Sequence, residues 1–378
     1  MKKNIFILAI AALFMQSCSH KDGNKTASGL LKSNFESVIN GETNSLYVLK
    51  NAAGVEVCIT NFGARIVSIL VPDRNGKLQD VVHGFDSIAD YQKYPTDFGA
   101  TIGRYANRIA NGQIVIDGKT IQLPQNNFGH CLHGGPQGWQ YKVFKTVSVS
   151  DNTLEVAYFS PDGDQNFPGN VTATVRFHLT DDNAIKIDFE ATTDQKTIIN
   201  MCNHSYFNLS GDAANTVLYD ELYINADYYT PVDNTFMTTG EIAPVTGTPM
   251  DFTTPKTIGQ DIDKYDFVQL KNGNGYDHNW VLNTAGDITQ LAAKVTSPAS
   301  GITLEVYTNE PGIQIYTGNF LNGTVKGKGG VVYQQRSAIC LETQHYPDSP
   351  NKAHFPSVIL EPGQTYQSTC VYKFGVEK

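Results

Sequence analysis

Residues 171–191 read VTATVRFHLTDDNAIKIDFEA. On both sides of the polar TDDN every second residue is apolar, namely Val171, Ala173, Val175, Phe177 and Leu179 before it and Ile185, Ile187 and Phe189 after it. Successive side chains of a strand point to opposite faces of a sheet, so this pattern predicts two half-buried β-strands. The short polar turn between them predicts that the two strands pair in an antiparallel manner.

The same alternation recurs along the chain, for example in VEVCI (55–59) and in QIVIDGKTIQL (113–123). The latter stretch places Asp117-Gly118 between two runs, and this dipeptide favours a tight hairpin turn in which both residues take positive φ. After the first residues of the chain, no stretch has a helical period of twelve or more residues; only 86–94 could form one or two helical turns. We therefore expect an all-β fold, one large antiparallel β-sandwich, and not a parallel β/α architecture.

The composition is that of a soluble globular protein. Of the 378 residues, 40% are hydrophobic and 17% are charged, and the formal net charge is −9. An acidic chain without a basic stripe lacks the charges needed to neutralise phosphates. Nucleic acids and strongly anionic ligands are therefore not expected as partners.

The N-terminus has the pattern of a bacterial lipoprotein signal. Lys2 and Lys3 precede an apolar run over 5–15 that is too short to span a bilayer, and MQSCSH (15–20) resembles a lipoprotein cleavage site. The alternatives are an uncleaved helix or an ordinary secretory cleavage in which the cysteine has no role. A lipoprotein signal predicts attachment to the cell envelope of a Gram-negative bacterium, on the periplasmic side or at the outer membrane.

Cleavage at this signal would remove residues 1–17 and leave Cys18 as the lipidated first residue. Two lysines are lost, so the formal charge moves from −9 to −11. Residues 18–40 are rich in Ser, Lys, Asn and Gly, and we expect them to form a flexible tether that holds a domain over 41–378 away from the membrane. The lipid anchor is then the expected contact with the membrane.

Five further cysteines follow, at Cys58, Cys131, Cys202, Cys340 and Cys370. None forms a CxxC pair, so their spacing indicates no zinc site. Their number is odd, so at least one has no partner within the chain. Cys58, Cys340 and Cys370 stand in apolar alternating runs and are expected to be buried as small hydrophobic residues.

Polar residues gather in a few stretches rich in glycine and asparagine: GRYANRIANG (103–112), CLHGGPQGW (131–139), MCNHSYFNLSG (201–211), GYDHNW (275–280), EPGIQIYTGNF (310–320) and LETQHYPDSP (341–350). Loops held by a rigid sheet are where binding sites are usually built. His133 and His204 have small or hydrogen-bonding neighbours, and histidine exchanges protons readily near neutral pH. Arg108 could donate to hydroxyl groups or form a surface ion pair, and Asp277 could orient hydroxyl groups or cap a turn.

Gln314 alternates with Ile313 and Ile315, so it faces the opposite side of its strand, which favours a polar pocket. The chain has no H-E-x-x-H pattern, no glycine-rich phosphate loop and no G-x-S-x-G elbow. Two chemistries stay open on the residues alone. One is cofactor-free acid/base catalysis by histidine and Glu342, and the other is a glycosidase-like use of Glu342 with Asp277.

The motifs taken together resemble one family, the aldose 1-epimerases or galactose mutarotases. The resemblance rests on FGATIGRYANRIANG, LHGG, NHSYFNLSG, YTPVDNTFMTTGEIAPVTGTPMDF, YDHNW, EPGIQIYTGNFLNGT and LETQHYPDSPN, in the order of the family and over roughly 41–378. It implies a large β-sandwich with a sugar site in a cleft. It also implies an enzyme that interconverts the α and β anomers of free aldoses such as glucose and galactose, with no metal or organic cofactor.

The resemblance assigns a role to individual residues. Glu342 is the implied general base and His204 the implied general acid. The implied substrate-binding residues are Asn107, Arg108, His133, Asp277 and Gln314. A sugar-binding module without turnover, a glycoside hydrolase and a phosphosugar epimerase are the competing functions. The first would not need Glu342 and His204 together, and the last would need more basic residues than this acidic chain offers.

Overall fold

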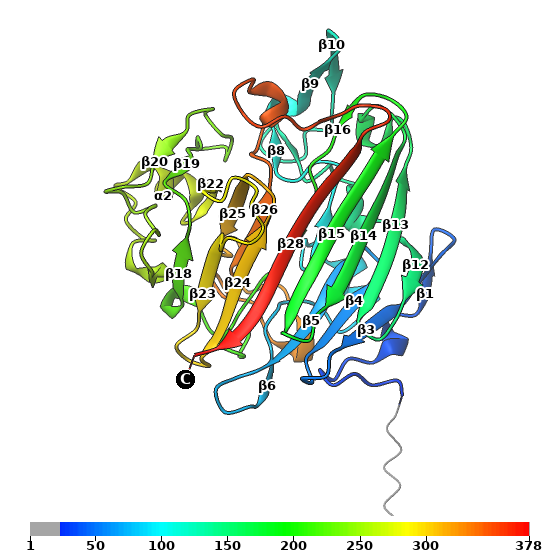
Figure 1. Ribbon diagram of the computed structural model, residues 1–378, viewed down its shortest axis with the longest axis vertical. Coiled ribbons are helices and arrows are strands. Elements are labelled where there is room, and N and C mark those ends of the chain that lie inside the picture. Colours follow the sequence, from blue (N-terminus) through cyan, green and yellow to red (C-terminus); the bar gives the residue numbers. More distant parts are fainter. Residues whose placement is uncertain (1–22, 378) are drawn as a thin grey trace, which may run out of the picture.

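The computed structural model describes residues 23–377 and is dominated by antiparallel β-strands (Figure 1). Its largest sheet has nine strands in the order β12-β13-β14-β15-β28-β24-β23-β18-β21. Their bounds in that order are Lys145–Val149, Thr153–Ser160, Val171–Leu179, Ala184–Thr193, Thr365–Val376, Ile302–Thr308, Ala293–Thr296, Glu221–Ile224 and Lys256–Thr257.

The two strands predicted from residues 171–191 are β14 and β15, and they pair antiparallel with Val175 opposite Phe189. The apolar positions of the alternation are buried on both strands. The C-terminal strand β28 lies in the middle of the sheet, and Figure 1 shows it in red between green β15 and yellow-orange β24. The end of the chain therefore joins the strands of its middle part to those of its last third.

Two smaller sheets cover the apolar face of this sheet. The five-stranded sheet contains β20 (Ala243–Pro244), β19 (Tyr228–Thr230), β22 (Asp277–Val281), β25 (Gly312–Tyr316) and β26 (Cys340–Gln344), and the four-stranded sheet contains β3 (Leu46–Lys50), β4 (Glu56–Thr60), β5 (Arg65–Pro72) and β6 (Leu78–Asp80). Ile59 of β4, Ile313 of β25 and Phe189 of β15 belong to one buried core cluster. The predicted β-sandwich is thereby confirmed.

Short strand pairs complete the fold: β1–β2 (Ser37–Ile39, Glu42–Asn44), β7–β17 (Ala100–Ile102, Cys202–His204), β8–β11 (Arg108–Ile109, Cys131–Leu132), β9–β10 (Gln113–Ile116, Lys119–Gln122) and β16–β27 (Thr197–Ile198, Ile359–Leu360). The hairpin predicted at Asp117-Gly118 joins β9 to β10, and the two residues have φ of 50° and 74°. That prediction is confirmed.

The α-helices of residues 23–377 are short, with α1 at Ile88–Lys93 and α2 at Val268–Gly273. The first lies inside the stretch 86–94 where one or two turns were expected. The 3₁₀ turns are Lys32–Asn34, Ala110–Gly112, Trp139–Tyr141, Asp164–Asn166, Val217–Tyr219, Ile258–Gln260, Lys328–Gly330 and Ser349–Asn351. Over the described part of the chain, no helix combines the length and the apolar character needed to cross a membrane.

The predicted signal over 1–17 and the lipidation site at Cys18 lie outside the described residues. The flexible tether predicted over 18–40 is wrong for residues 24–40, which pack on the sandwich. Leu30 and Phe35 are 3% and 0% exposed and belong to a cluster with residues of β3, β4 and β5. The N–H group of Ala27 donates to the buried carboxylate of Glu56 at 2.8 Å. The segment is polar on average, but Leu30 and Phe35 are buried, and their burial holds the residues between them on the sandwich.

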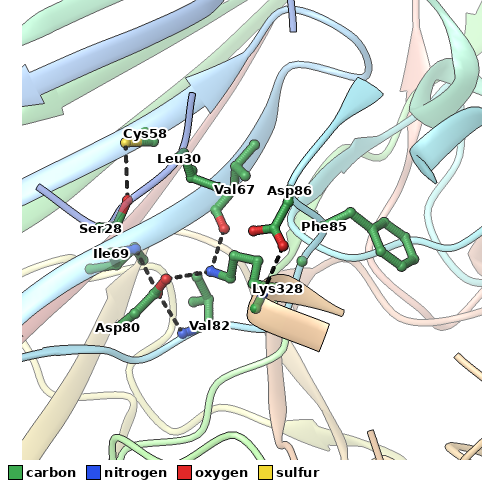
Figure 2. Close-up of polar contacts among 12 residues, drawn as sticks. Ser28, Leu30, Cys58, Val67, Ile69, Asp80, Val82, Phe85, Asp86 and Lys328 are labelled. Atoms are coloured by element: carbon green, nitrogen blue, oxygen red, sulfur yellow. Dashed lines mark hydrogen bonds and ion pairs between the residues drawn. The ribbon is translucent and has the colours of Figure 1, made fainter. Parts of the chain in front are cut away.

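Figure 2 shows how a distant loop is fastened beside this segment. The Lys328 ammonium donates to the carbonyl of Val67 and to the Asp80 carboxylate, both at 2.6 Å, and the N–H of Gly329 donates to Asp86 at 2.7 Å. A largely buried ammonium needs such partners to offset its lost hydration. The loop that contains Lys328 is therefore tied to β5 and β6.

We predict that Phe35→Ala lowers the free energy of unfolding by roughly 3–5 kcal/mol, because the substitution leaves a void in a fully buried cluster. Denaturant unfolding of the chain that begins at residue 19 measures the change. Val38→Ala, three residues later at a position that is 71% exposed, is the matched control and is expected to change stability by less than about 0.5 kcal/mol. Equal effects of the two substitutions would show that the segment does not pack as described.

Candidate active site

Glu342 stands in the middle of β26 with its side chain buried, 2% exposed. β17 lies against β26, and strand alternation turns Cys202 and His204 to the same face of β17. Each carboxylate oxygen of Glu342 meets one of them. Oε1 lies 3.5 Å from His204 Nε2, and Oε2 accepts from Cys202 Sγ at 3.5 Å. The strands β26 and β17 therefore hold the Glu342 carboxylate and the His204 imidazole side by side.

Burial raises the pKa of Glu342 to about 7. The imidazole of His204 and the thiol of Cys202 favour the ionised form, whereas the negative charge of Asp277 disfavours it. A carboxylate with a pKa near 7 is both substantially ionised at neutral pH and basic enough to remove a proton from a hydroxyl group. This carboxylate is suited to act as a general base.

His133 presents an N–H donor to the same space. The backbone N–H of Asn107 donates to His133 Nδ1 at 3.1 Å, so in the neutral ring the proton resides on Nε2. Burial, together with the nearby His204 and Arg108, lowers the pKa of His133 well below its ordinary value and keeps the ring neutral. The rings of His133 and His204 meet edge to face with centroids 5.1 Å apart, and His204 stacks on Tyr206 at 5.0 Å.

Arg108 begins β8, and Asn107 directly precedes it. Asn107 accepts from the N–H of Arg108 at 2.8 Å through its side-chain oxygen. The guanidinium of Arg108 donates from Nε to Asn127 at 3.0 Å and lies 5.1 Å from the ring centroid of Phe236. These contacts fix the plane of the guanidinium, a rigid fork of donors, at the wall of the site.

Asp277 begins β22, and Gln314 lies on the neighbouring β25. The amide of Gln314 donates to Asp277 Oδ1 at 2.7 Å. Burial raises the pKa of Asp277, while Arg108 and the Gln314 amide act in the opposite direction. Gln314 is not among the residues that line the cavity. The amide of Gln314 therefore holds the Asp277 carboxylate in place, and the direct substrate contact that the resemblance implies for Gln314 stays a prediction.

These side chains surround a cavity of about 320 Å³. This volume is at the small end of ordinary ligand sites, which span roughly 300–1,000 Å³. Six of the seven predicted site residues line it: Asn107, Arg108, His133, His204, Asp277 and Glu342. The sequence had not singled out the others, which are Asp97, Asn127, Phe128, Leu132, Tyr206, Phe236, Tyr316 and Phe320. Five of these eight stood within the quoted motifs, which was the available signal for them: Leu132, Tyr206, Phe236, Tyr316 and Phe320.

Four lining residues have a backbone in the left-handed region, namely Asn107 (φ 64°), Phe128 (φ 48°), His133 (φ 51°) and Phe236 (φ 63°). This conformation is uncommon for residues other than glycine, and for bulky side chains each instance costs on the order of 1–3 kcal/mol. Such strain is characteristic of functional sites. Here it directs two aromatic rings and one imidazole toward the same cavity.

Asp97, His133 and His204 bring possible ligand atoms within 4.8 Å of one another, which raises the question of a metal ion. The donor set does not fit one. Nδ1 of His133 already accepts from the Asn107 N–H, so Nε2 carries the proton and has no lone pair to offer. The three residues suit hydrogen bonding to a polar ligand better than metal binding.

The family model described as aldose 1-epimerase matches residues 45–373. The chain belongs to the aldose 1-epimerase family. A galactose mutarotase from Sus scrofa is 43% identical over 323 residues, which is 85% of this chain and 92% of the relative. An aldose 1-epimerase from Escherichia coli K12 is 39% identical over 339 residues, which is 89% of this chain and 97% of the relative.

Solved structures of aldose 1-epimerase relatives agree with this assignment. A GalM/aldose epimerase homologue from C. elegans superposes with a TM-score of 0.80 and 33% identity, covering 89% of this chain and 100% of the homologue. A galactose 1-epimerase from Lactobacillus acidophilus NCFM superposes with a TM-score of 0.79 and 31% identity, covering 90% of this chain and 97% of that epimerase. The family and the fold predicted from the motifs are confirmed, and the chain is an enzyme of the epimerase class. The packed segment 24–40 precedes the region that the family model matches.

We predict that Glu342→Gln stabilises the protein at pH 8 and does so much less at pH 5. The folded-state pKa of about 7 lies above the ordinary 4.5, so the folded state loses stability as the pH rises from 4.5 to 7 and Glu342 ionises. The loss reaches about 3 kcal/mol at pH 8, and the neutral amide avoids it. Denaturant unfolding of both proteins at both pH values measures the difference. An equal effect at pH 5 and pH 8 would contradict a raised pKa.

Proposed function

We propose that the protein interconverts the α and β anomers of free aldoses such as glucose and galactose, with Glu342 as the general base and His204 as the general acid. The observation that carries the proposal is the 3.5 Å separation between Glu342 Oε1 and His204 Nε2 at the wall of the cavity. Family membership supports the reaction class, and this geometry supports the two roles.

The reaction requires two proton transfers at neighbouring oxygens. The base removes the proton of the C1 hydroxyl while the acid protonates the ring oxygen O5, so that the C1–O5 bond breaks and an open-chain aldehyde forms. Both oxygens are bonded to C1, so the two catalytic groups must stand side by side. Glu342 and His204 meet this requirement because they project from adjacent strands, β26 and β17.

Ring closure reverses the proton transfers. Rotation about C1–C2 turns the other face of the aldehyde toward the C5 hydroxyl, His204 then takes the proton of that hydroxyl, and Glu342 returns a proton to O1. Each turnover leaves both residues as they began, because ring closure returns the two protons that ring opening transferred. Each positioned group contributes about 10²–10⁴-fold, which is sufficient for a reaction that already proceeds in water.

The remaining polar groups are suited to hold the sugar. The Nε2–H of His133 faces the same cavity as His204 and can donate to the ring-oxygen side of the substrate. Arg108 offers donors, Asn107 an amide and Asp277 acceptors for the other hydroxyl groups. Tyr206 and Phe236 supply apolar faces of the kind that sugar rings pack against. Their convergence on a small cavity favours a single sugar ring as the reacting unit.

We also propose that the protein is anchored in the cell envelope through a lipid on Cys18, on the strength of the N-terminal sequence pattern. The packed segment begins near residue 24, so about six residues separate the anchor from the domain. Six extended residues span at most about 20 Å. The enzyme would therefore sit close to the membrane surface.

Two substitutions test the catalytic roles. Glu342→Gln and His204→Asn are each expected to lower the catalysed rate of anomer exchange by about 10²–10⁴-fold, because each removes one proton transfer. Polarimetry of freshly dissolved α-glucose and α-galactose measures the rate, and calorimetry is expected to show that sugar binding is better preserved than turnover.

The matched control for these substitutions is His345→Asn. His345 also pairs with a buried glutamate, Glu310, but neither residue lines the cavity. This variant is expected to retain the rate of the unmodified enzyme. Wild-type exchange in either Glu342→Gln or His204→Asn would refute the assigned roles, and dye release from an aryl glycoside would indicate a hydrolase instead.

A separate experiment tests the anchor. Cys18→Ser is expected to move the protein from the membrane fraction to the soluble fraction of the cells that express it, because the lipid can no longer be attached. Labelling with a fatty-acid probe should occur in the unmodified protein and be absent from the variant. A Cys18→Ser protein that stays with the membranes would contradict the proposal.

A further inference from the structure

Glu342 has few partners for a buried carboxylate. Among the described residues, its side-chain hydrogen bonds and ion pairs are the contact of Oε1 with His204 and the contact of Oε2 with the Cys202 thiol. Both Cys202 and Glu342 are almost completely buried, with exposures of 0% and 2%. The mechanism above uses the contact with His204 but gives no role to the contact with Cys202.

We propose that Cys202 is a positioning residue for the base: its S–H group holds Oε2 of Glu342, so that Oε1 faces the C1 hydroxyl of the sugar beside His204. This inference rests on the proposed function, since it assigns the thiol a role through Glu342. The strand period supports it, because alternate residues of β17 reach the two oxygens of one carboxylate. A carboxylate held at one oxygen cannot rotate freely about its last side-chain bond.

The thiol is chemically suited to this task. Burial and the charge of Glu342 raise the pKa of Cys202 well above its ordinary value, so the thiol keeps its proton at neutral pH. A thiol is also a weaker donor than a hydroxyl group. It can therefore orient the carboxylate while stabilising the ionised form only slightly, which leaves Glu342 basic enough to remove a proton.

Several other groups face Glu342 and contribute to its titration. The titratable and charged side chains around it are His204, Asp277, Asp97, Arg108, Tyr206, Tyr316, Cys340 and Tyr372. None of them changes when the residue at position 202 is substituted. Differences between variants at this position therefore report on the group that contacts Oε2.

The competing explanation is that Cys202 only fills space. Cys58 offers a matched comparison, because it is also fully buried and also lies near a glutamate, with Sγ 3.7 Å from Glu56 Oε1 and 3.8 Å from Ser28 Oγ. Figure 2 shows Cys58 with Ser28 of the N-terminal segment, among residues that do not line the active-site cavity. Substituting Cys58 tests the effect of changing a buried thiol without touching the base.

The experiment follows the pH dependence of kcat for anomer exchange in Cys202→Ser, Cys202→Ala and Cys58→Ser. The rate of the unmodified enzyme should fall as the pH drops through about 7, because protonated Glu342 cannot act as a base. A hydroxyl donor favours the carboxylate, so Cys202→Ser is expected to move this midpoint to lower pH. Cys202→Ala removes the donor and should move it to higher pH. Each shift is expected to be up to about one pH unit.

KM should change little in both Cys202 variants, since the thiol does not line the cavity. Cys58→Ser should leave the midpoint in place. Unchanged midpoints in both Cys202 variants, or shifts in the same direction, would overturn the proposal and leave Cys202 a packing residue. If Cys202→Ala fails to fold, Cys202→Val replaces it, since valine also lacks a donor, and it is expected to shift the midpoint in the same direction as alanine.

An infrared titration of the Glu342 carboxyl group, with Glu342→Gln subtracted, gives a readout without turnover. It should show the same order of midpoints, serine below cysteine below alanine. This measurement separates the two possible failures. Wild-type turnover in Glu342→Gln would refute the proposed base, whereas equal infrared midpoints in the position-202 variants would refute the role of the thiol alone.

Discussion

A carboxylate that is kept away from water between two strands is the constraint on which the rest of this site depends. Isolated in such a place, Glu342 would bind a proton and lose its use as a base. Its oxygens are instead met by His204 and Cys202, the two same-face residues of one short strand. The result is a pKa of about 7, high enough for basicity and low enough for ionisation at neutral pH. Burial raises the pKa of Glu342, the contacts with His204 and Cys202 offset part of that rise, and the two effects together set the basicity of the carboxylate.

This balance makes the strand geometry part of the function. A slip of one residue in β17 would turn Cys202 and His204 away from Glu342 and present Asn203 instead. The pairing of β17 with β7 opposes such a slip, because it sets Cys202 opposite Ile102, and Cys202 is buried in a cluster with Ala100 and Ile102. On this rigid support the loops tolerate strained backbone at Phe128, His133 and Phe236. The fold thus supports the buried charge of Glu342 and several residues with strained backbone, both of which lower stability.

Much of this architecture could be predicted from the sequence. Period-2 alternation in 171–191 identifies strands because burial on one face is a local property of the chain, and Asp117-Gly118 identifies a turn for the same reason. Six of the seven predicted site residues line the cavity because the motifs that contain them are long and specific. The aromatic rings of Phe128 and Phe236 escaped prediction, since their positions depend on backbone conformations that composition does not reveal.

Other features escaped prediction because tertiary contacts outweigh local composition. Gln314 lies on the polar face of its strand as expected, but the sequence did not indicate that its amide contacts Asp277. Residues 24–40 look like a tether by average polarity, yet Phe35 alone buries a complete ring in the core. A stretch with few apolar residues can still be ordered if those residues reach the core.

The central claim is that one sugar lies with its C1 hydroxyl at Glu342 and its ring oxygen at His204. A crystal structure of Glu342→Gln with bound glucose or galactose tests it most directly. The account predicts that O1 lies within about 2.6–3.2 Å of the side chain at position 342, and O5 within the same distance of His204 Nε2. A sugar bound with O5 away from His204, or with C1 directed toward Asp277, would contradict it.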